Sequence, residues 1–150
     1  EFTRLDWEDH IWNTERVHQE AREAGVDPNF LNAEILPQMK RQLQFVASAV
    51  ANDVKVRRAG NWKLYGCDFM ITKDREARLV DVNPFPGWDW TFRTKFALAY
   101  RKRLFAAMYD LVFDIHQGAD LAAEMQMPRS NGFQLIYHGK SLEELDLTAL

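Results

Sequence analysis

The stretch LYGCDFMITKDREARLVDVNPFP, residues 64–86, decides the fold of this chain. Aromatic and β-branched residues dominate its two ends, as is typical of strands, and the charged segment 73–76 has the length of a hairpin connection. We therefore predict one strand over 61–72 and a second over 77–83, paired antiparallel across a four-residue loop. Pro84 ends the second strand, because proline cannot donate a hydrogen bond to a central ladder.

The register of this hairpin determines which side chains share a face. A four-residue loop places Asp68 opposite Asp81 and Met70 opposite Leu79. Because side chains alternate along a strand, we expect one polar face and one apolar face that belongs in the core. The predicted polar face holds Gly66, Asp68, Met70, Leu79, Asp81 and Asn83, and the predicted apolar face holds Cys67, Phe69, Ile71, Val80 and Val82.

Asp68 and Asp81 are the informative pair on the polar face. Like charges directly opposite each other destabilise a sheet, and a cation between them would relieve the repulsion. Asn83 adds a neutral oxygen on the same side, and Gly66 leaves room. Two carboxylates and an amide oxygen suit Mg²⁺, which completes its shell with phosphate oxygens and water. The plainer interpretation is an exposed face whose acids are solvated or paired with bases, and a one-residue slip would move one Asp to the other face.

Outside the hairpin, apolar residues recur at intervals of three and four residues, which predicts three helices. The first follows Asp6, a candidate N-cap, and ends before Gly25. The second runs over 32–52, and the third starts near 89 or 91 and ends at 116.

The remaining segments are predicted to be shorter elements. Residues 54–60 form a basic linker, 119–125 a short helix and 133–137 a strand. Ser141 and Glu144 match a capping box for a last helical turn. We divide the chain into a domain over 1–116 and a C-terminal extension over 117–150.

The composition limits the classes of protein to consider. The chain has 150 residues, of which 47% are hydrophobic, and a net charge of -3, so it can bury a core and carries no global basic charge for nucleic acid. Cys67, the single cysteine, excludes an intrachain disulfide and a cysteine-based zinc site. No apolar run approaches the roughly 18 residues that span a bilayer, and no glycine-rich phosphate loop occurs. A cytoplasmic protein is expected.

Two segments together resemble the ATP-grasp domain of the tubulin–tyrosine ligase-like family. The first is Tyr65-Gly66-Cys67-Asp68-Phe69 followed by Leu79-Val80-Asp81-Val82-Asn83-Pro84-Phe85-Pro86, against a family pattern of aromatic, Gly, any residue, Asp, Phe, a charged turn and Leu-x-Glu-Val-Asn-x-x-Pro. The second is Ile35-Leu36-Pro37-Gln38-Met39-Lys40, which is similar to the family's Ile-x-Pro-Gln-Ile-Lys. The likeness covers 5–113.

The resemblance implies an α+β fold, the C-terminal part of an ATP-grasp domain, with an antiparallel hairpin packed against helices. It implies that the magnesium ligands and catalytic residues are Asp68, Asp81 and Asn83, with ATP lying over their face. Met70 and Leu79 would add apolar contact to ATP. Arg93 and Lys95 open a basic stretch just downstream and are candidate phosphate contacts, the alternative being a solvated helix face.

The implied reaction is carboxylate–amine ligation, in which ATP phosphorylates a carboxylate and an amine then displaces phosphate. The implied partners are a protein carboxylate, with tubulin as one candidate and a cytoskeletal location to match, and a free amino acid; neither nucleic acid nor membrane is expected. The family's N-terminal half precedes the matched region, so we expect another segment or polypeptide to supply it and the 150 residues alone to be inactive. Asp81 stands where the family has Glu, which favours a second hypothesis: a catalytically inactive interaction subunit of a larger assembly.

Overall fold

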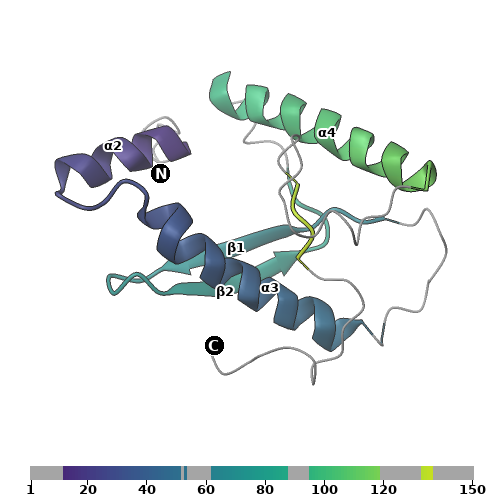
Figure 1. Cartoon of the computed structure of the whole chain (residues 1–150), viewed down its shortest axis with the longest axis horizontal. Coiled ribbons are helices and arrows are strands. Elements are labelled where there is room, and N and C mark those ends of the chain that lie inside the picture. The colour runs from purple at the N-terminus through teal and green to yellow at the C-terminus, as the bar shows by residue number, and fades with distance from the viewer. Residues whose placement is uncertain (1–11, 52, 54–61, 88–94, 119–132, 137–150) are drawn as a thin grey trace, which may run out of the picture.

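The structure is a computed structural model that describes residues 12–51, 53, 62–87, 95–118 and 133–136. In chain order its elements are α2 (Thr14–Glu23), the π-helical segment η1 (Leu31–Ile35), α3 (Leu36–Val50), β1 (Gly66–Ile71), β2 (Ala77–Asn83) and α4 (Lys95–His116). Figure 1 shows α3 running along the hairpin of β1 and β2, with α4 on the other side of the hairpin in this view. The expected mixture of helices and an antiparallel hairpin is confirmed.

Helix α2 begins later than the sequence predicts. Asn13 has an extended backbone, and its Oδ1 accepts a hydrogen bond from the backbone N–H of Arg16 at 2.8 Å. Asn13 is therefore the N-cap, satisfying one of the free donors of the first turn. A continuous helix from Asp6 is wrong because this cap interrupts it, and Asp6 itself lies outside the described residues.

The end of α2 is as predicted. Gly25 has a φ of 71°, in the left-handed region that glycine adopts without steric cost. The N–H of Val26 donates to the carbonyl of Ala21 at 2.8 Å, and the N–H of Gly25 donates to that of Arg22 at 3.1 Å. These two bonds form a Schellman motif, which satisfies carbonyls at the helix end.

The second predicted helix is confirmed over most of its length by η1 and α3, although its π-helical start was not foreseen. Pro37 lies in the first turn of α3, where its missing N–H costs little. The third predicted helix ends at His116, as α4 does. Its predicted start, the linker 54–60 and most of the predicted tail lie outside the described residues, and 133–136 contain no strand.

The turn of the hairpin has three residues rather than the predicted four. The N–H of Thr72 donates to the carbonyl of Glu76 at 2.9 Å, and the N–H of Arg75 donates to that of Thr72 at 3.0 Å. Arg75 has a φ of 61°, so the loop is a turn followed by a left-handed residue. Arg75 also forms an ion pair with Glu34 at 2.8 Å, which joins the turn to η1.

A β-bulge compensates for the shorter turn. Near the turn Phe69 pairs with Leu79, yet one residue further Asp68 pairs with Asp81, so Val80 is an extra residue on β2. Leu79 therefore shares a face with Phe69, and its predicted place on the polar face is wrong. Val80 was predicted on the apolar face, which is also wrong, because Leu79 occupies that face and Val80 is the next residue along the strand. The side chain of Val80 is 60% exposed.

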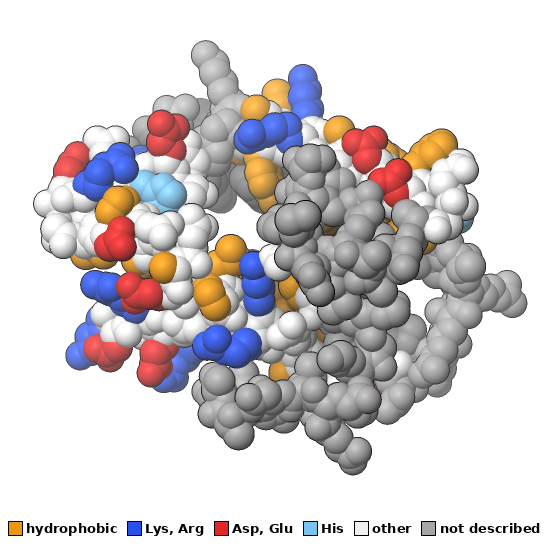
Figure 2. All heavy atoms as spheres, in the orientation of Figure 1, with side chains coloured by type: hydrophobic (Ala, Val, Ile, Leu, Met, Phe, Trp, Pro, Cys, Tyr) orange, Lys and Arg blue, Asp and Glu red, His pale blue; other side chains and the backbone are white. Residues whose placement is uncertain are grey.

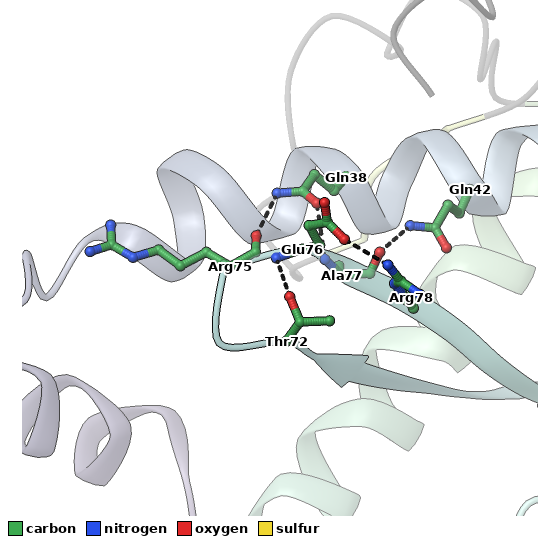
Figure 3. Close-up of polar contacts among 7 residues, drawn as sticks. All are labelled: Gln38, Gln42, Thr72, Arg75, Glu76, Ala77 and Arg78. Carbon is green, nitrogen blue, oxygen red and sulfur yellow. Dashed lines mark hydrogen bonds and ion pairs between the residues drawn. The ribbon is translucent and has the colours of Figure 1, made fainter.

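Two glutamines of α3 satisfy the outer edge of β2 (Figure 3). The N–H of Ala77 donates to Oε1 of Gln38 at 2.9 Å, and Nε2 of Gln42 donates to the carbonyl of Ala77 at 2.6 Å. Outside the figure, the N–H of Leu79 donates to Oε1 of Gln42 at 2.8 Å. Four helical residues advance about 6 Å and two strand residues about 6.6 Å. The spacing of the glutamines therefore matches that of the outward-facing groups of the strand.

Few side chains are buried in the described part of the chain, and most of those are small. Ile35 is the largest that is fully buried, at 1% exposure. The other buried residues are Ala21, Ser48, Ala77, Ala97, Ala107 and Met108. Among the helices in the described part of the chain, none combines the length and apolar character that crossing a bilayer requires. With so small a core, the polar bonds between α3 and β2 carry much of the attachment of the helix to the sheet.

We expect Gln42→Leu to lower the free energy of unfolding by about 1–3 kcal/mol, because it leaves a part-buried carbonyl and a part-buried N–H without a partner. Urea denaturation checks this. Gln44→Leu is the matched control, because Gln44 lies half-buried on the same helix and has no side-chain hydrogen bond to a described residue. Equal losses in the two variants would contradict the role assigned to Gln42.

Candidate metal centre

The structure places Asp68 directly opposite Asp81, as the sequence predicts. Gly66 lies opposite Asn83 in the same ladder, so Asp68, Asp81 and Asn83 share one face of the hairpin. Both aspartates are exposed, and Asn83 is half-buried. The pairing survives because the shorter turn and the bulge at Val80 shift the register by one residue in opposite directions.

The two carboxylates have no basic partner among the described residues. The ion pairs in this part of the chain are Arg16–Glu20, Arg75–Glu34 and Arg78–Glu76. Arg78 lies on the polar face opposite Met70, but its guanidinium is 2.9 Å from Glu76. The interpretation that these acids are paired with bases is therefore contradicted for the described residues. The interpretation that they are solvated remains. Repulsion between Asp68 and Asp81 is left uncompensated in this part of the molecule.

Asp81 and Asn83, the two candidate ligands on β2, each already accept a hydrogen bond from a nearby backbone N–H. Oδ1 of Asp81 accepts a hydrogen bond from the N–H of Val82 at 2.9 Å. Oδ1 of Asn83 accepts one from the N–H of Phe85 at 2.8 Å. Asp81 retains its second carboxylate oxygen, and the amide oxygen of Asn83 retains a lone pair. Together with Asp68 they still present hard oxygen donors of the kind that Mg²⁺ binds.

The bond from Phe85 to Asn83 folds the chain back over the start of β1. A Cβ at Gly66 would lie 3.0 Å from Cβ of Pro86, so this glycine allows the close approach of the proline. The room that the sequence predicted at Gly66 is thus used by Pro86. Nζ of Lys63 lies 3.8 Å from the centre of the Phe85 ring, a cation–π contact. Lys63 brings a positive charge to this end of the hairpin, and sequence reasoning did not select it.

The other predicted site residues separate into different places. Met70 lies on the polar face and is 64% exposed, as expected. Leu79 lies on the opposite face, with Phe69. Arg93 lies outside the described residues, and Lys95 is the first residue of α4, with its side chain outside the described part. The structure therefore brings Asp68, Asp81, Asn83 and Met70 to one face.

The carboxylates of the polar face affect the thiol of Cys67, although this side chain lies on the opposite face of β1. Burial raises the pKa of the Cys67 thiol above its ordinary value, and the carboxylates of Asp68 and Asp81 raise it further. The thiol is therefore a poor nucleophile at neutral pH, in agreement with the packing role expected for it.

In the described part of the face that Figure 2 shows, side chains of one charge sign do not gather in one area. Acidic and basic side chains are interspersed around α2, α3 and the hairpin turn in the described part of this view. Within the described residues, no three His, Cys, Asp or Glu side chains gather as a metal cluster. Any metal held on the hairpin would rely on two carboxylates, the Asn83 amide and further ligands from elsewhere.

No family model, curated protein or solved structure matches this chain.

We expect Gly66→Ala to destabilise the fold by about 1 kcal/mol, because the new methyl group would press on Pro86. Gly87→Ala is the control, since a Cβ there meets nothing within 4 Å. It should be neutral or slightly stabilising, because alanine lowers the entropy of the unfolded chain. Thermal denaturation of both variants checks the difference in sign, and a neutral Gly66→Ala would show that Pro86 can move away.

We expect Asp68→Asn to speed the alkylation of Cys67 by iodoacetamide at about pH 8, because losing a negative charge lowers the pKa of the thiol and raises the thiolate fraction. The gain should stay below about tenfold, since burial is the larger cause of the raised pKa. Asp74→Asn, in the hairpin turn, should leave the rate unchanged. An unchanged rate in Asp68→Asn would mean that the charge of this face does not reach the thiol.

Proposed function

We propose that this chain is part of an ATP- and Mg²⁺-dependent carboxylate–amine ligase of the tubulin–tyrosine ligase-like kind. The observation that carries the proposal is the pairing of Asp68 with Asp81 on an exposed face, without a basic partner among the described residues. A protein gains no stability from two opposed carboxylates. Their opposition is explained if the face binds a cation, and the neighbouring Asn83 supplies the third oxygen that such a site uses.

Asp68, Asp81 and Asn83 would hold Mg²⁺ on the hairpin. When bound, the metal would neutralise phosphate charge and orient the transferred group. Asp68 lies within β1, and the Asx bond to Phe85 holds the Asn83 side chain in place. Both side chains are thus carried by regular or hydrogen-bonded backbone, which favours a fixed geometry for the ligands.

Apolar contact to the nucleotide would come from Met70, which is exposed on the same face. Leu79 is left out of this role, because it lies on the opposite face with Phe69. Arg93 and Lys95 remain candidates for phosphate contact, from their position in the sequence alone. The described hairpin forms one side of a nucleotide site, so a further segment or polypeptide would supply the phosphate-binding lysines of the other side.

The reaction would join the amine of an amino acid to a carboxylate of a protein acceptor, through an acyl phosphate formed with ATP. A tubulin tail is one candidate acceptor, and a cytoplasmic, cytoskeleton-associated location would follow from it.

A second candidate is an interaction or structural subunit that has kept the scaffold and lost catalysis. Two observations favour it. Asp81 is one methylene shorter than the family's Glu, and its Oδ1 is already engaged by the N–H of Val82. Oδ1 of Asn83 is engaged as well, by Phe85. A site with fewer free donors would bind the metal more weakly.

Calorimetric titration of ATP into the intact native polypeptide, with and without Mg²⁺, tests the proposal. We expect binding that requires Mg²⁺ and that weakens by more than about tenfold in Asp68→Asn. Asp74→Asn, an exposed acid of the hairpin turn, should bind like the unmodified protein. Binding that is unchanged in Asp68→Asn would contradict the ligand assignment, and no binding to the folded, complete protein would favour the inactive subunit.

A further inference from the structure

The two outer edges of the hairpin differ in how their backbone groups are satisfied. On β2, the N–H groups of Ala77 and Leu79 donate to the side chains of Gln38 and Gln42. Beyond the bulge, the N–H of Val82 donates to Oδ1 of Asp81. These outward donors of β2 are thus occupied by side chains, so this edge is closed to a further strand.

The outer edge of β1 has no such cover. In an antiparallel pair, residues directly opposite each other both turn their N–H and C=O groups inward or both turn them outward. The backbone N–H and C=O groups point outward at Ala77, Leu79 and Val82. Those of their partners Ile71, Phe69 and Cys67 therefore point outward too, on the other edge of the hairpin. None of these three forms a hydrogen bond on that side in the part of the chain that the structure describes. A two-stranded sheet is marginal by itself, and a bare edge is a template for another strand.

We propose that β1 pairs antiparallel with β1 of a second copy of this chain, with Phe69 opposite Phe69 of the second copy. Cys67 then lies opposite Ile71 of the second copy, and each of these pairs exchanges two backbone hydrogen bonds. The two hairpins form one four-stranded sheet in the order β2, β1, β1, β2. This inference concerns the edge of the hairpin and does not depend on the ligase proposal, which concerns its face.

The charges of β1 select this register. Centring the pair on Phe69 places Asp68 opposite Met70 of the second copy, so no carboxylate faces another across the new ladder. Centring it on Asp68 would place two carboxylates directly opposite each other, which is destabilising. Centring it on Met70 would pair only 69–71 of the strand. The register centred on Phe69 pairs 67–71 and is the longest that avoids the repulsion.

The faces of β1 favour a second copy over an acidic strand from another protein. An acidic strand would add carboxylates beside Asp68 and Asp81. With a second copy, the two-fold axis is perpendicular to the sheet. The apolar faces of the two copies therefore lie side by side, and so do their polar faces. Cys67, Phe69 and Ile71 of both copies form one apolar surface, and Ile71, 44% exposed in the single chain, gains cover. Both polar faces stay open on the opposite side.

Disulfide cross-linking tests the register. In Ile71→Cys, the native Cys67 of one copy lies opposite the substituted position of the other, with Cα atoms about 5.5 Å apart, within the range that a disulfide spans. We expect a covalent dimer on mild oxidation. Met70→Cys is the matched control, because position 70 lies one residue away on the opposite face and should not cross-link. Equal cross-linking in the two variants, or none in Ile71→Cys, would overturn this register.

Sedimentation of the unmodified full chain over a wide concentration range tests the association itself. We expect a reversible dimer, a monomer in Ile71→Lys, which puts a charge on the apolar side of the bare edge, and a dimer in Val80→Lys, which puts the same charge on the exposed face. Circular dichroism shows whether both variants are folded. A monomer at every concentration in the unmodified chain would refute the second copy and leave the β1 edge to a strand from another polypeptide.

Discussion

The hydrogen bonds from Gln38 and Gln42 to the edge of β2 are the constraint on which the rest of the structure depends. They attach α3 to the sheet, and few apolar side chains of the described residues are fully buried. Gln38 also donates to the carbonyl of Arg75 at 3.0 Å, and Arg75 pairs with Glu34, so the same helix holds the turn. Because the helix occupies one edge of the hairpin, the other edge is the one left for association.

The turn that these contacts hold determines the register of the polar face. A three-residue loop alone would move Asp81 out of line with Asp68. The same shorter turn places Leu79 on the face opposite to the predicted one, and the bulge at Val80 brings Asp81 back opposite Asp68. Bulges occur where a strand must re-aim a side chain, often near functional sites. The opposed carboxylates thus depend on two irregularities that offset each other.

Local hydrogen bonds at the end of β2 determine how many oxygens of Asp81 and Asn83 are free to bind a metal. Asp81 and Asn83 each hold a backbone N–H, and these bonds stabilise the end of β2 and the fold-back of Pro86 onto Gly66. A metal would have to share those oxygens. Asp68 has no such local bond within the described residues, so its carboxylate oxygens are the most available of the proposed ligands.

The sequence by itself determined the features that depend on local pattern: the periodic helices, the end of α2 at Gly25 and the two strands. It predicted the opposition of Asp68 and Asp81 from a four-residue loop, and the pair is opposed because the shorter turn and the bulge offset each other. It also marked the segment around Gln38 through its resemblance to a family motif, without indicating what the glutamine does. Only the tertiary structure decided the cap at Asn13, the length of the turn, the bulge, and the side on which Leu79 lies. The physical reason is that alternation predicts a face only while the ladder is regular. Here contacts between α3 and the hairpin, separated by more than thirty residues, accompany the departures from regularity.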